Sequence, residues 1–212
     1  MIKFVLILMF IIFQINLLCA EQKIDYIELD VMDKQHIIEK ISKNNFKIYT
    51  EENDDKMHQS FLKIKTPIKN TGLIFFEDME KDVGFDLFPI LIIPTEQKNK
   101  FQKVELPPIR QEGGSPFVSS VFYANIDNDI EEELLILIRW PQRHYDYSGT
   151  FYKVYVYDFI KNKDNSFTIQ FKEDISKKLE CSDIVLRDGN KINDCNFEDA
   201  KGVKRYLRKL GY

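Results

Sequence analysis

Short apolar runs, separated by turn-forming residues, follow one another along most of the chain. In the second half they lie at residues 117–123, 133–140, 150–159 and 166–171. Within the run 133–140, Leu134, Ile136, Ile138 and Trp140 share one face, as the two-residue period of a strand requires. The run 150–159 is apolar on both faces, which is typical of a central strand covered on both sides. We therefore predict four consecutive strands in this half.

The first half predicts further strands, rich in Ile, Phe, Tyr and Val. These runs lie at residues 24–29, 46–49, 61–65, 72–76, 85–93 and 101–106. Prolines follow several of them, as expected for a residue that cannot continue a ladder. Pro89 lies inside the run 85–93 and predicts an edge strand or a break there.

Two segments favour helix over strand. Asp33 can cap a short helix over residues 34–43, and residues 197–210 carry basic side chains late, where they complement a helix dipole. A helical turn is expected at 173–179, and Asp188-Gly189 predicts a hairpin turn. The sequence thus predicts a β-dominated α+β fold with antiparallel sheets, a short N-terminal helix and a C-terminal helix.

The first twenty residues have the order of a secretory signal. Lys3 is their only charge, an apolar run follows, and Cys19-Ala20 precedes Glu21. The order favours cleavage after Ala20; the two alternatives to cleavage are acylation of Cys19 and a retained membrane anchor. Cleavage after Ala20 would leave residues 21–212 as one mature domain, with two halves at 21–107 and 117–212 around a segment rich in Pro and Gly. We expect a periplasmic or secreted protein without a membrane span after cleavage.

Cysteine usage and charge narrow the class of protein. Without Cys19 the chain keeps Cys181 and Cys195, and an even count in an exported chain predicts a disulfide. The alternative is two buried thiols. The net charge is −4, so the composition predicts no nucleic-acid partner.

An acidic segment between two predicted strands is the most informative motif. Oxygen-bearing groups recur at alternate positions, as a calcium loop requires: the side chains of Asn125, Asp127, Asp129 and Glu133, and the carbonyl of Glu131. Three carboxylates held this close would repel one another without a cation. We predict a Ca²⁺ site here; the alternative is a solvated acidic turn.

The spacing of this segment resembles the D-x-D-x-D-G-x-x-D/E calcium loop of FG-GAP and VCBS-type β-propeller blades. Asn125 stands in place of the first Asp, and Ile130 in place of Gly. The chain has only one such loop, whereas a propeller needs four or more blades, so the resemblance implies a calcium loop and not a propeller.

Residues 141–149 follow the strand run that ends at Trp140 and predict a long loop. Long loops on a rigid scaffold often carry function, and Arg and Tyr dominate interface energetics. The predicted partner-binding residues are Trp140, Arg143, His144, Tyr145 and Tyr147. The alternative is that Tyr145 and Tyr147 pack back on the sheet edge.

From residue 117 to 171 the layout of strand, acidic loop, strand and aromatic loop resembles small exported bacterial inhibitors of lysozyme-type wall hydrolases and related immunity proteins. The resemblance implies a protein that covers the cleft of a hydrolase or secreted toxin with an exposed loop. The alternative is a calcium-stabilised envelope structural or adhesion-type module.

Catalytic motifs are sparse. His36, His58 and His144 are scattered, Ser148 lacks a G-x-S-x-G elbow, and Walker A and Rossmann patterns are absent. Paired carboxylates could serve glycoside hydrolysis, but no pair stands out among 34 acidic residues. We therefore expect a binding protein without catalytic activity.

Overall fold

The computed structural model describes residues 46–48, 61–63, 71–78, 84–94, 101–127, 129, 131–161 and 167–212. The expected signal at 1–20, strand at 24–29 and N-terminal helix at 34–43 lie outside the described residues. The described part consists mainly of antiparallel strands, with two helices, one of them C-terminal, as the β-dominated prediction requires. None of its helices is long and apolar enough to cross a membrane.

The first half forms a five-stranded antiparallel sheet. Its strands are β1 (Phe46–Ile48), β2 (Phe61–Lys63), β3 (Gly72–Asp78), β4 (Leu87–Pro94) and β5 (Phe101–Glu105). β3 pairs with β1, β2 and β4, and β5 lies beyond β4. Each strand begins and ends within two residues of the run that predicted it.

Pro89 corrects one expectation, because β4 is neither broken nor at an edge. It pairs with β3 on one side and β5 on the other, and Pro89 lies opposite Phe75. The carbonyl of Pro89 accepts from Leu106 N at 3.0 Å, just beyond the last β5 pair. Since N and O of one strand residue point to the same side, the missing N–H of Pro89 falls where the β5 ladder ends.

The second half forms a six-stranded sheet of order β11-β10-β8-β7-β6, with β9 also paired to β8. Its strands are β6 (Phe117–Ala124), β7 (Glu133–Arg143), β8 (Tyr147–Lys161), β9 (Phe167–Phe171), β10 (Glu180–Leu186) and β11 (Lys191–Asn193). The helices are α3 (Glu173–Lys178) and α4 (Ala200–Leu210). Cys181 and Cys195 form the expected disulfide, which ties β10 to the segment before α4.

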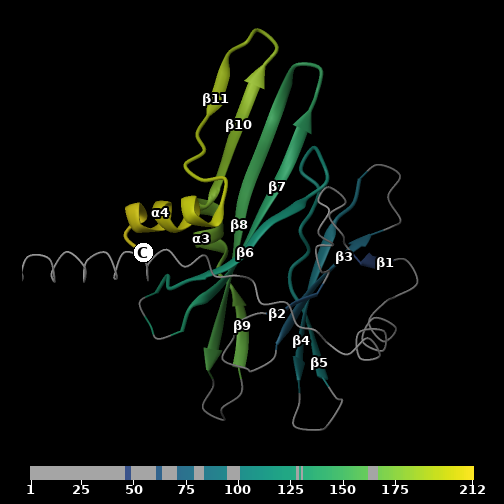
Figure 1. Cartoon of the computed structure of the whole chain (residues 1–212), viewed down its shortest axis with the longest axis vertical. Coiled ribbons are helices and arrows are strands. Elements are labelled where there is room, and N and C mark those ends of the chain that lie inside the picture. Colours follow the sequence, from purple (N-terminus) through teal and green to yellow (C-terminus); the bar gives the residue numbers. More distant parts are fainter. Residues whose placement is uncertain are drawn as a thin grey trace, which may run out of the picture.

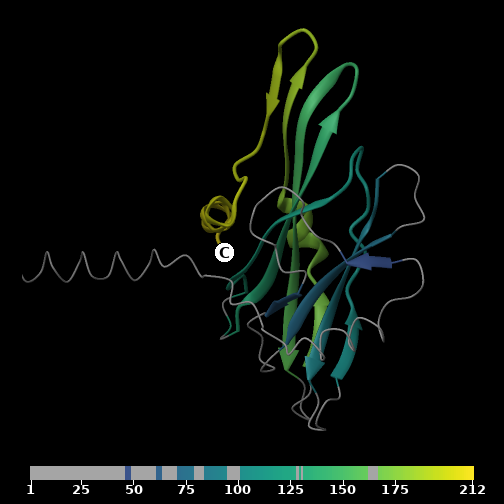
Figure 2. The same cartoon turned by 45° about the vertical axis from the view of Figure 1, so that its right-hand side comes forward.

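The two sheets and the helices form three layers, with the second sheet in the middle (Figures 1 and 2). Alternate residues of β7 and β8 face the first sheet, where Leu134, Ile136 and Tyr157 join Leu73 and Leu91 in one core cluster. The opposite residues face the helices, in a second cluster with side chains of α4. This explains why β8 is apolar on both faces, as expected for a central strand.

The segment between the two sheets, residues 106–116, packs against the first sheet, although its prolines and glycines predict a boundary. Ile109 is fully buried and bridges Leu87 by two backbone hydrogen bonds of 2.9 and 2.8 Å. Buried Asp86 accepts from Arg110 Nη1 at 2.7 Å and from Gln111 N at 2.9 Å. The two predicted halves therefore correspond to two sheets that share one core.

Candidate metal centre and hairpin tip

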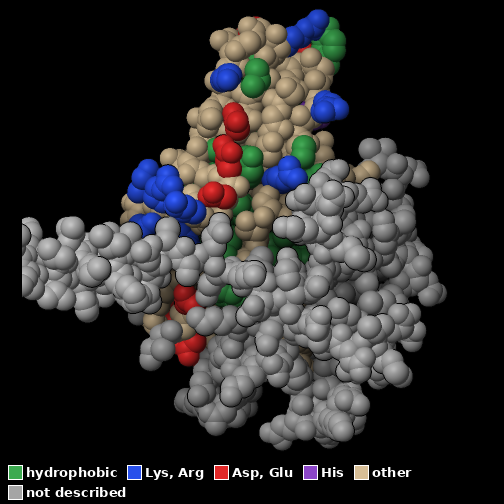
Figure 3. Space-filling model, in the orientation of Figure 1, with side chains coloured by type: hydrophobic (Ala, Val, Ile, Leu, Met, Phe, Trp, Pro, Cys, Tyr) green, Lys and Arg blue, Asp and Glu red, His purple; other side chains and the backbone are tan. Residues whose placement is uncertain are grey.

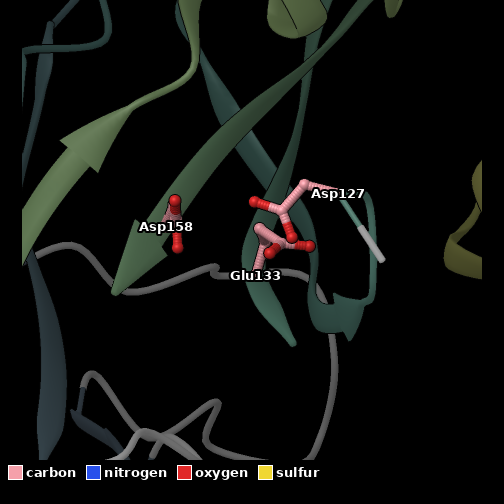
Figure 4. Close-up of side chains that lie close together, drawn as sticks. All are labelled: Asp127, Glu133 and Asp158. Atoms are coloured by element: carbon pink, nitrogen blue, oxygen red, sulfur yellow. The ribbon is translucent and has the colours of Figure 1, made fainter. Parts of the chain in front are cut away.

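Three carboxylates meet where β7 begins and β8 nears its end. Leu134 pairs with Tyr157, so Glu133 and Asp158, one residue further out on each strand, lie beside each other on the face toward the helices. Asp127 reaches them from the loop between β6 and β7 (Figure 4). One oxygen from each carboxylate lies within 4.8 Å of the other two, so the three side chains could hold a metal ion.

Glu133 is the buried member of this cluster. Its residue is 1% exposed, and Oε2 accepts from the backbone N–H of Ile126 at 2.6 Å. Oε1 is buried and has no hydrogen-bond partner among the described residues. Desolvation, with smaller contributions from Asp127 and Asp158, raises the pKa of Glu133 to about 7. A neighbouring cation would satisfy the free oxygen and favour the ionised form.

Lys172 supplies the positive charge that faces the cluster. It follows β9, and its backbone N–H donates to the carbonyl of Val156 at 2.9 Å. Its ammonium nitrogen lies 2.7 Å from Asp158 Oδ2 and 3.8 Å from Asp127 Oδ2. The hydrogen bond to Asp158 is the main cause of the raised pKa of Lys172.

The structure brings together only part of the predicted ligand set. The Asn125 side-chain amide donates to the carbonyl of Asp129, and Asp129 Oδ1 accepts from Glu131 N at 2.9 Å. Asp127 Oδ1 also accepts from Asp129 N, at 3.4 Å. These bonds shape the loop, and the carboxylate of Asp129 does not belong to the three-residue cluster. For Glu131 the predicted ligand atom is the backbone carbonyl oxygen, which stays a prediction.

Asp158 is the member that sequence reasoning missed. Its signal was available, because Asp158 is the only charged residue in the otherwise apolar stretch 154–160. A charge that is 4% exposed in a central strand needs a partner. That partner is Lys172, and the β7–β8 register also places Asp158 beside Glu133; the sequence specifies neither contact.

The cluster is chemically a site for a hard cation. Carboxylate oxygens suit Ca²⁺, Mg²⁺ and Mn²⁺ better than soft metals, which favour sulfur ligands. Three carboxylates carry a formal charge that the single Lys172 does not balance. The arrangement could therefore hold a hard cation, and the donor set leaves the identity of that cation open.

The predicted long loop is a tight hairpin instead. β7 and β8 pair as far as Arg143 and Ser148, leaving only three residues between the strands, and His144 N donates to Tyr147 O at 2.9 Å. Gly149 belongs to β8; a Cβ there would overlap the carbonyl oxygen of Asp183, so glycine lets β10 approach. The sequence missed this because Pro141 and Gly149 read as loop residues.

Trp140, predicted to face a partner, is fully buried instead. Its indole N–H donates to the carbonyl of Arg110 at 2.8 Å, and it packs in the core between the sheets. The even-numbered residues of β7 face the first sheet, and this parity assigns Trp140 to the core. It is therefore not available to a partner.

The other predicted contact residues lie at the hairpin tip, which we define as residues 142–149 and 184–192. The side chain of Tyr145 is 78% exposed, and the Arg187 guanidinium lies 4.0 Å from its ring centroid. His144 stacks on Tyr147 at 4.5 Å, and both Arg143 and His144 are exposed. Arg187 comes from the β10–β11 turn and was not among the predicted partner-binding residues. Its backbone N–H donates to the backbone carbonyl of Asp146 at 2.8 Å.

The hairpin tip projects beyond α4 and the first sheet in both orientations (Figures 1 and 2). Figure 3 shows Lys and Arg side chains beside hydrophobic ones at its outer end. The tip also exposes Val185 and Ile192, at 37% and 50%. No protein-family model, curated protein or solved structure matches this chain.

Proposed function

We propose that this chain is an exported binding protein that inhibits or neutralises a cell-wall hydrolase or a secreted toxin. The observation that carries the proposal is the ordered and exposed Tyr145–Arg187 pair at the projecting hairpin tip. The signal-like segment at residues 1–20 motivates export, and the Cys181–Cys195 disulfide is compatible with an oxidising compartment.

The tip suits insertion into a concave partner. Tyr and Arg are the residue types most enriched among interface hot spots. The Arg187 guanidinium contacts the Tyr145 ring, and a backbone hydrogen bond from Arg187 N to Asp146 O joins the two turns beneath it. An exposed aromatic side chain on a narrow projection can enter a cleft that a flat surface cannot.

We further propose that the carboxylate cluster binds Ca²⁺ and stabilises the scaffold behind the tip. The buried, unpartnered Oε1 of Glu133 supports a cation in this place. Eight paired positions of β7 and β8 separate the cluster from the tip, and the nine residue steps from Glu133 to Gln142 span roughly 30 Å at the rise of a strand. Ca²⁺ would therefore act on the stability of the β7–β8 hairpin and would not touch the partner.

The tip proposal is tested by recovering envelope and secreted proteins on the immobilised protein, then assaying recovered hydrolases or toxins for inhibition. Replacing Tyr145 and Arg187 by Ala should abolish inhibition while leaving the melting temperature unchanged. The matched control replaces Leu210 and Arg208, an exposed apolar and basic pair on α4, and should inhibit like wild type. Inhibition that survives loss of the tip pair refutes this role for the tip.

The second candidate is a calcium-stabilised envelope structural or adhesion-type module. The observation that favours it is the position of the cluster, which links the β6–β7 loop, β8 and the start of α3. Such a module would still be stabilised by Ca²⁺. It would inhibit no hydrolase or toxin, whether as wild type or with the Tyr145 and Arg187 or the Leu210 and Arg208 substitutions.

A further inference from the structure

We propose that Lys172 occupies the cation position at Asp158 and Asp127, and that a divalent cation binds by displacing its ammonium group. This inference rests on the proposed metal site and concerns how that site is controlled. Lys172 would then set the concentration of cation to which the protein responds, by competing for the same oxygens.

The distances make simultaneous occupation unfavourable. The ammonium nitrogen lies 2.7 Å from Asp158 Oδ2 and 3.8 Å from Asp127 Oδ2. A Ca²⁺ ion bound to Asp158 Oδ2 at about 2.4 Å would lie no more than about 5 Å from that nitrogen. Two positive groups this close repel strongly in a half-buried site. Coordination by Asp158 and Asp127 together therefore requires the ammonium group to leave.

The structure allows Lys172 to leave without unfolding its surroundings. Both backbone groups of Lys172 are hydrogen-bonded: its N–H donates to the carbonyl of Val156 at 2.9 Å, and its carbonyl accepts from the N–H of Ser176 at 3.0 Å. The side chain is 24% exposed, and its four-carbon stem can rotate toward solvent. The β9 strand and α3 would keep their backbone contacts while the charge moves out.

A different arrangement gives the opposite expectation for a Lys172 variant. The cation could bind only Asp127 and Glu133, leaving the Lys172–Asp158 ion pair intact. Removing Lys172 would then raise the affinity for the cation no more than removing any other nearby positive charge. Glu133 contributes its unpartnered buried oxygen in either arrangement, so the two differ only in Asp158 and Lys172.

The test is calorimetric titration of Ca²⁺, and then of Mg²⁺ and Mn²⁺, into chelator-stripped protein, for wild type, Lys172→Met and the matched control Lys177→Met. Lys177 lies one turn further on, is exposed, and pairs with Glu173 at 2.8 Å. Displacement predicts at least tenfold tighter binding for Lys172→Met and a change below about twofold for Lys177→Met. Lys172→Gln, which keeps a hydrogen-bond donor without the charge, should also bind more tightly and guards against a packing effect of Met.

Each outcome bears on the inference in a distinct way. Binding by Lys172→Met alone, with none by wild type, would support displacement in its strongest form. Equal or weaker binding by both Lys172 variants, beside clear binding by wild type, overturns displacement but leaves the metal site standing. Absence of Ca²⁺, Mg²⁺ and Mn²⁺ binding in every folded variant overturns both. Circular dichroism of each variant establishes that it is folded.

Discussion

Replacing Glu133 by Gln should stabilise the protein in EDTA at pH 8, an unusual result for a buried polar residue. The Gln side-chain oxygen can accept from Ile126 N, as Glu133 Oε2 does at 2.6 Å. Its amide group can donate to Asp127 or Asp158, whose carboxylates lie beside it. The substitution thus keeps the hydrogen bond, removes a buried charge and turns repulsion into attraction.

The magnitude follows from the pKa of Glu133, which burial raises from 4.5 to about 7. At about 1.36 kcal/mol per unit, ionising Glu133 at pH 8 costs the folded state about 3 kcal/mol. The folded state binds the proton more tightly than the unfolded state, so this stability is present below pH 4.5 and is lost as pH rises to about 7. Because the Gln side chain does not titrate, the Glu133→Gln protein keeps this stability at pH 8.

The assay is thermal melting of wild type, Glu133→Gln and Glu131→Gln in EDTA from pH 5 to 8. Because this stability begins to be lost above pH 4.5, the Glu133→Gln advantage should grow from about 1 kcal/mol at pH 5 to about 3 kcal/mol at pH 8, the latter roughly 6–12 °C in melting temperature for a chain of this size. Glu131→Gln removes a charge outside the cluster and should change stability little. Added Ca²⁺ should raise the melting temperature of wild type but not of Glu133→Gln. A Glu133→Gln protein that is less stable than wild type at pH 8 in EDTA would refute the reasoning.

Three further substitutions test the scaffold. Gly149→Ala should lower the free energy of unfolding in urea by roughly 2 kcal/mol, because the new methyl group overlaps a β10 carbonyl. The control Gly189→Ala should lower it less, because Gly189 also has a positive φ but open space around it. Trp140→Phe should lower the free energy of unfolding by about 2 kcal/mol, through a cavity and a lost indole hydrogen bond; unchanged stability would contradict its place in the core. Replacing Cys181 and Cys195 by Ser should cost about 3 kcal/mol, from the loop of 14 residues that the disulfide closes, and this loss should match that of the reduced wild type in denaturant melts.

The sequence predicted β1 to β9 to within about three residues, because their signals are local, whereas β10 begins at Glu180, four residues before the predicted run 184–186. Alternation of apolar residues identified β7, a run that is apolar on both faces identified β8, and Asp188-Gly189 identified the turn before β11. The errors came from residues whose meaning depends on a neighbouring strand. Pro89 suggested an edge, and Gly149 a loop, yet each lies inside a strand because of what the next strand does at that point.

The candidate metal centre was predicted in part for the same reason. Asp127 and Glu133 are close in sequence, and their spacing alone indicated a cation site. Asp158 and Lys172 join them from β8 and from the end of β9, in places that only strand register decides. Asp129 fitted the spacing but bonds within its own loop.

By itself, the sequence determined the class of fold, the strand positions, the cysteine pair and the presence of an acidic loop, since each depends on local pattern or composition. Tertiary structure alone decided which carboxylates meet and that Arg187 lies over Tyr145. These are contacts between strands far apart in the chain. They depend on register and on which face each strand buries, and no local pattern specifies both.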